Sequence, residues 1–364
     1  MMRGRRLRYY IARRFVVAIL GAFMVCMALI FLIDLIELLR QARKASAVSI
    51  GSVLVMAGLR LPAYSEILLP FAVLVGSIGA LLSLGRKSEL AVMRAGGMSV
   101  WQFLRPGLTT AFVIGVVSVA AYNPLAATAR AQSERMMAEL LGNELSLLQN
   151  LGAGAWLRQD GADGASILNA KVVSNQGLVL VGVTAFLYDR QGHFVESVVA
   201  QRAELGDGYW ELRQGTVARP GQEPVAFDVY SLSTYLTQER AQDALGSEIS
   251  VSFWQLPALI EVAEKAKLSA ERYRVQYALL LSRPLLLVCM VLLAATVSLR
   301  SFRMGGIQSM VVTGIIGGVG FFLATEVSRQ IGLAGLVAPT VAVWAPILIS
   351  MLVSFAVLLH QEDG

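Results

Sequence analysis

A short charged segment, residues 84–101, lies between two long apolar stretches of the chain. Ser88 suits the N-cap of a helix, and Glu89 would occupy the first turn, where the helix dipole favours an anion. Gly96 and Gly97 are residue types that end helices. The segment therefore predicts a helix of about three turns or less, with a charge at each end.

The apolar residues of this predicted helix gather on one face. Leu90 and Met93 are three residues apart, which places them on the same side, while Glu89 and Arg94 supply charges that can set the register of a contact. A helix of this length is too short to cross a bilayer or to have a core of its own. It must lie either on lipid headgroups or against another protein, and the pattern alone leaves both interpretations open.

A second group of charged residues follows the first apolar stretch, 15–33. The basic members suit charge-assisted hydrogen bonds with phosphates, but they are equally typical of solvated loop charges paired with the neighbouring carboxylates. This group comprises Asp34, Glu37, Arg40, Arg43 and Lys44.

Two ionisable residues, Arg60 and Glu66, lie inside or beside the second apolar stretch. Charged groups at membrane depth are costly, so they usually face a cavity or a partner helix. Lining a cavity and pairing across helices are both consistent with the sequence.

The composition excludes several classes of function. Of the 364 residues, 56% are hydrophobic and 15% are charged, whereas soluble domains are about 25% charged. The net charge of +6 comes from arginines beside apolar stretches, which argues against nucleic acid as a partner. Two cysteines, two histidines and the absence of a P-loop motif predict no metal site, no catalytic set and no ATP site in this chain.

The hydropathy pattern predicts six transmembrane helices. Lys and Arg are concentrated in the loops on one side, which places both termini and the 84–101 segment in the cytoplasm. The predicted spans are 15–33, 57–84, 107–122, 278–299, 306–324 and 337–359. Glycines 314, 317, 318 and 320 of the fifth span suit close helix packing or a movable interface.

Between the third and fourth spans the chain is polar and alternates in short apolar runs. Such runs, separated by turn sequences, predict an antiparallel sandwich or jelly roll. The run at 178–183 is the most apolar and is expected at an exposed edge. The sequence thus predicts an α-helical membrane protein with an inserted periplasmic all-β, jelly-roll-like domain. Its expected parts are 1–128, 129–272 and 273–364.

The order of these segments, the Ile33–Leu38 end of the first span and the Ser88–Gly97 string resemble the LptF/LptG family of lipopolysaccharide-export permeases. The resemblance covers essentially the whole chain, and the string SELAVMRAGG is its most specific part. The acidic end of the first span is more similar to the LptG branch than to the LptF branch.

The resemblance implies a permease subunit in the bacterial inner membrane that extracts lipopolysaccharide and passes it along periplasmic jelly rolls. It implies a second six-span permease, two cytoplasmic ATPase subunits that bind ATP and Mg, and a single-span periplasmic jelly-roll partner. It also implies that the 88–97 helix couples the chain to the ATPase. The residues expected in that coupling are Ser88, Glu89, Leu90, Met93, Arg94, Gly96 and Gly97. The lipid or gate candidates are Asp34, Glu37, Arg40, Arg43, Lys44, Arg60 and Glu66.

Two other functions compete with this interpretation. A permease-like or mechanotransmission subunit of another ABC system usually has four spans, with its outer domain after the first. An ATPase-independent secondary transporter predicts charged relays at mid-membrane and inverted repeats, neither of which is clear here.

Overall fold

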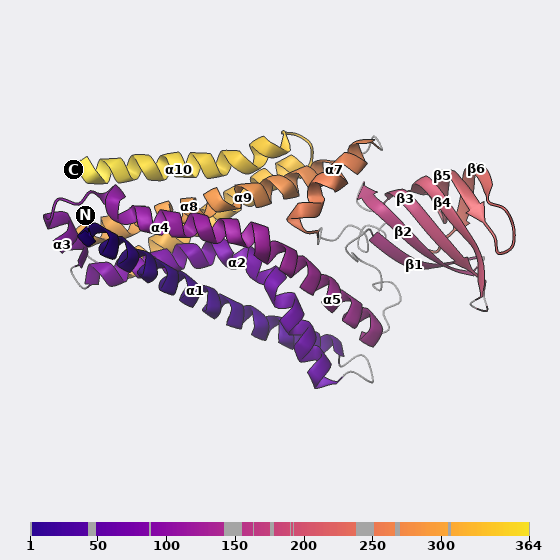
Figure 1. Ribbon diagram of the computed structural model, residues 1–364, viewed down its shortest axis with the longest axis horizontal. Coiled ribbons are helices and arrows are strands. Elements are labelled where there is room, and N and C mark those ends of the chain that lie inside the picture. Colours follow the sequence, from indigo (N-terminus) through magenta and orange to yellow (C-terminus); the bar gives the residue numbers. More distant parts are fainter. Residues whose placement is uncertain are drawn as a thin grey trace. The chain divides into compact units, whose positions relative to one another are not determined.

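A computed structural model supplies the fold of the chain. It consists of long helices and one group of β-strands (Figure 1). The residues it describes are 2–42, 49–86, 89–141, 155–162, 164–174, 178–189, 191, 193–237, 251–265, 270–304 and 307–363.

The helices follow the predicted apolar stretches but extend beyond most of them. A π-helical turn at Ser118–Tyr122 joins α4 to α5, and a 3-10 turn at Phe253–Gln255 precedes α7. The helices are α1 Met2–Ala42, α2 Ile50–Arg86, α3 Glu89–Ala95, α4 Val100–Val117, α5 Asn123–Leu141, α7 Leu256–Lys265, α8 Glu271–Met304, α9 Ile307–Leu333 and α10 Pro339–Asp363.

Within the described residues, five helical stretches are long and apolar enough to cross a membrane. They correspond to the first four predicted spans and the last one. The fifth predicted span lies in α9, which is a helix of 27 residues but is not among these five. The membrane-helical architecture is confirmed, while the number six stays a prediction. The five stretches are Arg6–Arg40, Ile50–Arg86, Val100–Ser133, Glu271–Leu299 and Pro339–Glu362.

The chain divides into two compact units, which are described separately. The first, here called the helical unit, comprises Met1–Ile33, Leu61–Asn123 and Arg274–Gly364. The second, called the β unit, comprises Asp34–Arg60 and Pro124–Tyr273. The predicted domain ranges stay predictions.

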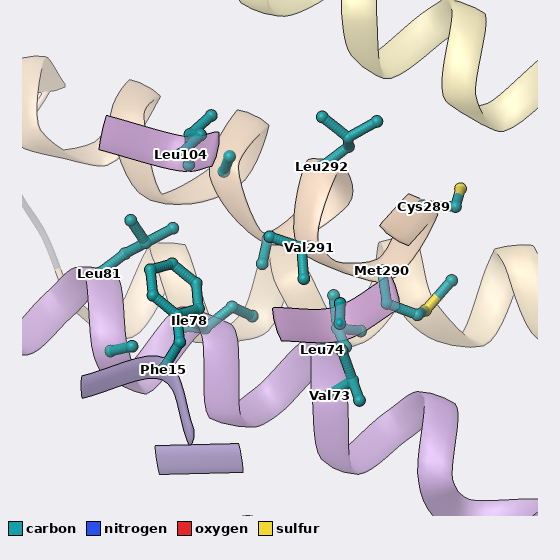
Figure 2. Packing of buried hydrophobic residues seen from close by; sticks show 14 of the residues in the cluster. Phe15, Val73, Leu74, Ile78, Leu81, Leu104, Cys289, Met290, Val291 and Leu292 are labelled. Carbon is teal, nitrogen blue, oxygen red and sulfur yellow. The ribbon is translucent and has the colours of Figure 1, made fainter. Parts of the chain in front are cut away.

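The core of the helical unit is formed by side chains from α1, α2, α3, α4, α8 and α10. Phe15 of α1 is fully buried and belongs to the same cluster as Ile78 of α2 and Val291 of α8 (Figure 2). Both chain termini lie at the end of this unit that carries α3 (Figure 1). A short helix is marginal in isolation, so α3 depends on this packing.

Two glycines allow helix backbones of this unit to touch. A Cβ atom at Gly76 of α2 would lie 2.5 Å from the Cα of Ile19 in α1. A Cβ at Gly115 of α4 would lie 2.5 Å from the Cα of Pro284 in α8. Both distances are shorter than carbon atoms tolerate, so any larger residue would separate these helix pairs.

The glycines of the fifth predicted span divide between packing and open space. Gly314 and Gly318 are buried against the side chains of Ile78 and Leu74 in α2. Gly317 and Gly320 are exposed, and a Cβ there would meet nothing within 4 Å. The first pair therefore brings α9 close to α2.

In the part of the chain that the structure describes, the β unit contains a six-stranded antiparallel sheet with the strands in chain order. Figure 1 shows them as one curved layer. The inserted all-β domain is thereby confirmed. The strands are β1 Ala155–Gly161, β2 Gly164–Ser174, β3 Val179–Tyr188, β4 Phe194–Leu205, β5 Tyr209–Ala218 and β6 Val225–Ser233.

The sheet corrects one expectation. The apolar run 178–183 forms the start of β3, which pairs with β2 and β4 and is therefore interior rather than an edge. Val179, Leu180 and Val181 of this run are all buried. The end strands are β1 and β6, which the sequence analysis did not single out.

The sheet bends along a single crease. The regular pairing passes over one residue in each of β2 to β6: Lys171, Gly182, Gln201, Gln214 and Asp228. Gly182 (φ +62°) and Gln214 (φ +54°) adopt the left-handed conformation there. The strands keep the same register on both sides of these positions, so the crease is a shared interruption of the pairing; the register shift that the sheet does contain lies at Leu187 and Tyr188, between β3 and β4.

The crease shifts the buried face by one residue, so core positions on its two sides lie three apart. The pairs Leu180 with Val183 and Ala200 with Ala203 show this shift, since all four belong to one cluster. One sheet can therefore enclose a core of its own, which explains its jelly-roll-like character.

A buried polar network holds the bent sheet together. Trp210 Nε1 and Thr234 Oγ1 both donate to Gln159 Oε1, at 2.9 and 2.7 Å. Gln159 Nε2 in turn donates to Ser166 Oγ at 3.1 Å. Near this network, the backbone N–H of Tyr235 donates to Asp160 O at 3.0 Å, which joins the ends of β1 and β6. Satisfied networks of this kind specify a single arrangement.

Candidate functional site

The predicted cytoplasmic helix is present as α3, with an acidic first residue as expected. Its C-terminus forms a Schellman motif, because Met98 N donates to Met93 O (3.1 Å) and Gly97 N to Arg94 O (2.9 Å). Gly97 has φ +78°, which only glycine adopts readily. The helix end predicted at Gly96 and Gly97 is confirmed, while Ser88 lies outside the described residues.

The apolar face of α3 packs inside this chain. Leu90 is 6% exposed and belongs to the core of the helical unit, and Met93 is partly buried against the same core. Both residues were expected in the coupling contact with an ATPase, whereas their side chains pack on this chain's own core. Val92 points outward instead and is 69% exposed.

Glu89 is bound by α1. The hydroxyl of Tyr10 lies 3.1 and 3.0 Å from the two carboxylate oxygens and donates to them. Charge-assisted hydrogen bonds are among the stronger ones in proteins. The first residue of α3 is therefore tied to the first membrane-spanning helix.

The charges at the far end of α1 are partly paired with each other. Arg40 Nη2 lies 2.9 Å from Glu37 Oε2, one helical turn away, and the two side chains are 74% and 42% exposed. Exposed pairs of this kind contribute little stability. Arg43 and Lys44 lie outside the described residues, so their contacts with lipid stay predictions.

The two ionisable residues of the second apolar stretch have separate partners. Arg60 Nη1 lies 3.3 Å from Asp34 Oδ1 of α1, and both side chains are largely buried. Glu66 Oε1 accepts from Arg283 Nη1 of α8 at 2.5 Å, with side-chain exposures of 12% and 17%. The structure thus shows pairing across helices, one of the two alternatives that the sequence left open.

Arg283 was missed by the sequence analysis. The signal was present, because this arginine stands before Pro284 inside an apolar span. Its Nη1 is also 3.3 Å from Ser118 Oγ, at the start of the π-helical turn. Asn123 Nδ2 donates to the other oxygen of Glu66 at 3.3 Å. The π-helical turn and α8 therefore meet on one carboxylate, and irregular turns of this kind are frequent at functional sites.

A cavity of about 150 Å³ lies in the helical unit between α2, α8, α9 and α10. Its lining is mostly apolar and includes Phe71 and Phe322, whose ring centroids are 5.4 Å apart. Glu326 and Arg329 line it as well, with Arg329 Nη2 donating to Glu326 Oε1 at 2.6 Å. Such a cavity suits part of an apolar chain rather than a polar cofactor. Among the described residues, no three His, Cys, Asp or Glu are grouped as a metal site.

Comparisons with known proteins agree with this arrangement. The family model "Lipopolysaccharide export system permease LptF/LptG" matches residues 9–360. The lipopolysaccharide export system permease protein LptG of Haemophilus influenzae is 23% identical over 334 residues, which cover 88% of this chain and 89% of that protein. Both matches extend over the helical unit and the β unit. The chain therefore belongs to the LptF/LptG family of lipopolysaccharide export system permeases.

Proposed function

We propose that this permease is one subunit of an ATP-driven machine that extracts lipopolysaccharide from the inner membrane and delivers it through periplasmic β domains. The observation that carries the proposal is α3, a short helix packed on the core of the helical unit that still displays an apolar side chain outward. A partner that binds this helix can act directly on the packed helices. Lipopolysaccharide is the proposed substrate because the family that matches residues 9–360 consists of lipopolysaccharide export system permeases.

The surface of α3 that remains for a cytoplasmic ATPase is the face opposite Leu90. It contains Val92 and Ala95 of α3, followed by Gly96 and Gly97 of the turn after the helix, and all four residues are exposed. Small residues beside one valine form a low ridge that fits a groove. We therefore assign the ATPase contact to this ridge and the internal contact to Leu90 and Met93.

Val92→Glu tests this assignment. The residue is exposed, so the change costs little stability of the chain, but it places a charge in an apolar contact. The ATPase should no longer co-purify in mild detergent, or should lose stimulation by the permease. Val199→Glu is the matched control, since Val199 is 49% exposed on the interior strand β4. Undiminished binding of the ATPase to the Val92 variant would contradict the assignment and favour a helix that rests on lipid.

Glu89→Arg tests coupling separately from binding. The change replaces the acceptor of Tyr10 with a cation, which repels Arg14 nearby. ATP hydrolysis should continue while lipid extraction in reconstituted vesicles falls. Unchanged extraction per ATP would show that this carboxylate has no part in coupling.

The orientation follows from the loops. Both termini lie at the α3 end of the helical unit (Figure 1), and basic loop residues are concentrated on that side. We therefore place this end in the cytoplasm and the β unit in the periplasm. Accessibility of single cysteines to a membrane-impermeant reagent, introduced at exposed Val92 and at Val199, tests the placement.

The basic residues after the first span are proposed to meet lipid phosphates. Only Arg40 is described, and it is largely exposed despite its pair with Glu37. Changing Arg40, Arg43 and Lys44 together to Glu should repel the phosphates. Photo-crosslinking of lipopolysaccharide at the end of α1 should then decrease. Undiminished crosslinking would leave these residues as solvated loop charges.

The β unit is proposed to pass lipid onward through strand addition with a neighbouring jelly roll. β1 and β6 are the end strands of the sheet, and end strands offer backbone groups to a partner. The proposed partners are a second permease of this family and a single-span protein with its own β domain. Deleting 145–250 should leave ATPase assembly intact and stop delivery, whereas full delivery by that variant would end the bridge proposal.

A further inference from the structure

The end of the helical unit that carries α3 contains polar contacts beyond the ridge that is assigned to the ATPase. The helix α3 has seven residues and is too short to keep its place without support. Apolar packing through Leu90 supplies part of that support, but such packing permits sliding. Hydrogen bonds are directional, and they occur at the first residue of α3 and at the first residue of α4. They fix the turn that joins these helices, here called the α3–α4 corner, more strictly than apolar packing does.

The first of these contacts is a chain of hydrogen bonds that joins three residues. Arg14 Nε and Nη2 donate to the hydroxyl oxygen of Tyr10 at 3.0 and 2.8 Å, while that hydroxyl donates to Glu89. The Arg14 guanidinium also lies 5.1 Å from the centre of the Tyr10 ring. Tyr10 thus connects a cation of α1 to the anion that begins α3.

The second contact comes from the last turn of α10. Glu362 Oε1 accepts the backbone N–H of Val100, the first residue of α4, at 3.1 Å. An anion at this end of a helix is favoured by the helix dipole. Phe355 of α10 packs against Trp101, with ring centroids 4.7 Å apart and the ring planes tilted by 37°. Gln361 Nε2 donates to Thr296 O of α8 at 3.2 Å, which connects the same turn to a third helix.

We infer that Tyr10 and Glu362 are positioning residues that join α3 and the α3–α4 corner to α1 and α10. When a partner displaces α3, the hydrogen bond to Tyr10 moves α1 with it, and the hydrogen bond to Glu362 moves α10. Neither movement requires the apolar core to rearrange first. This inference rests on the proposed function, because it names the route by which movement of α3 reaches the spans. Arg14 orients the Tyr10 hydroxyl toward Glu89.

Tyr10→Phe is the sharpest test, because it removes one hydroxyl and keeps the ring. In the reconstituted complex, ATPase binding and ATP hydrolysis should stay near the wild-type level, while lipopolysaccharide extracted per ATP falls by about tenfold or more, the size expected for one hydrogen bond to a charged group. Tyr9→Phe is the matched control, since Tyr9 is 72% exposed. Equal extraction per ATP in the Tyr10 variant and the wild type would overturn the inference.

A double-mutant cycle separates positioning from general damage. If Tyr10 acts through Glu89, then Tyr10→Phe, Glu89→Gln and the double variant should lower extraction per ATP by similar factors. Independent losses that multiply in the double variant would mean that Tyr10 does not act through Glu89. Glu362→Ala should also reduce extraction, and Glu362→Gln should restore part of it, because the amide oxygen still accepts from Val100.

Hydrogen exchange tests the same contacts without an ATPase. Amides of residues 89–95 should exchange several-fold faster in Tyr10→Phe than in Tyr9→Phe, because the hydrogen bond that fixes the first turn is missing. Equal exchange would overturn the inference even if the chain proved to have no ATPase partner. A third outcome separates the two proposals. If exchange is faster in Tyr10→Phe but the wild-type chain binds no ATPase, the proposed function is contradicted, while the role of Tyr10 in holding α3 in place is retained.

Discussion

The helical unit and the β unit both bury polar side chains, but they use them differently. In the helical unit, single contacts such as Glu66 with Arg283 join helices that otherwise meet through apolar side chains and glycines. In the β unit, backbone ladders already fix neighbouring strands, and the Gln159 network only holds the bent sheet closed. Helix pairs lack the continuous backbone hydrogen bonding that strands share. A few side chains therefore decide the arrangement of the helices, whereas the backbone conformation at the crease decides the shape of the sheet.

The largest effect is expected from breaking the ion pair of the helical unit. Arg283→Ala would leave the Glu66 carboxylate largely buried without its cation, and removing one partner of a buried pair costs about 3–5 kcal/mol. Unfolding of the purified chain in detergent measures this loss. The double variant with Met at both positions is the control and should recover most of the stability. A loss as small as that of an exposed pair would mean that these charges do not hold the helices together.

A comparable loss of stability is expected from the network of the β unit. Gln159→Leu deprives buried Trp210 and Thr234 of their shared acceptor, which costs about 1–3 kcal/mol for each unsatisfied group. Thermal unfolding followed by Trp fluorescence measures the change. Gln222→Leu provides the comparison, because Gln222 is exposed in the turn before β6. If both substitutions lowered the unfolding temperature equally, the buried Gln159 network would contribute no more stability than an exposed glutamine.

Replacing two glutamines of the crease by glycine should change the stability of the β unit in opposite directions. Gln214 has φ +54°, the one positive value among the described non-glycine residues. Gln214→Gly should therefore raise the stability of the β unit by about 0.5–1 kcal/mol, because glycine adopts this conformation without strain. Gln201→Gly, in the next strand of the same crease, should lower it. If both substitutions destabilise, backbone strain at Gln214 is not what shapes the bend.

The smallest effect concerns the turn between β3 and β4. The backbone N–H of His193 donates to Asp189 at 2.9 Å and lowers the pKa of that carboxyl, with help from the N–H of Gln191. A lowered folded-state pKa adds stability above the unfolded value, about 3.9, and this is lost as the pH falls through the folded value. Asp189→Asn should therefore be slightly less stable than the wild type at pH 7, and the gap should narrow toward pH 3. A gap independent of pH would exclude the charge of Asp189 as its cause.

The sequence by itself determined the helical stretches, the inserted β domain, the start and end of α3 and the family. These features depend on local patterns: apolar runs, alternation, and glycines after a short charged helix. The family resemblance rested on the order of the segments, the Ile33–Leu38 end of the first span and the SELAVMRAGG string, of which the string is the most specific part.

Tertiary structure alone decided which residues meet. Leu90 and Met93 share a face by spacing, but only packing shows that this face turns inward. Arg60 and Glu66 are close in sequence, yet each pairs with a residue of another helix. The interior place of 178–183 likewise depends on strand order. Periodicity defines a face of an element, whereas the identity of the neighbour on that face is set by contacts between residues far apart in the chain.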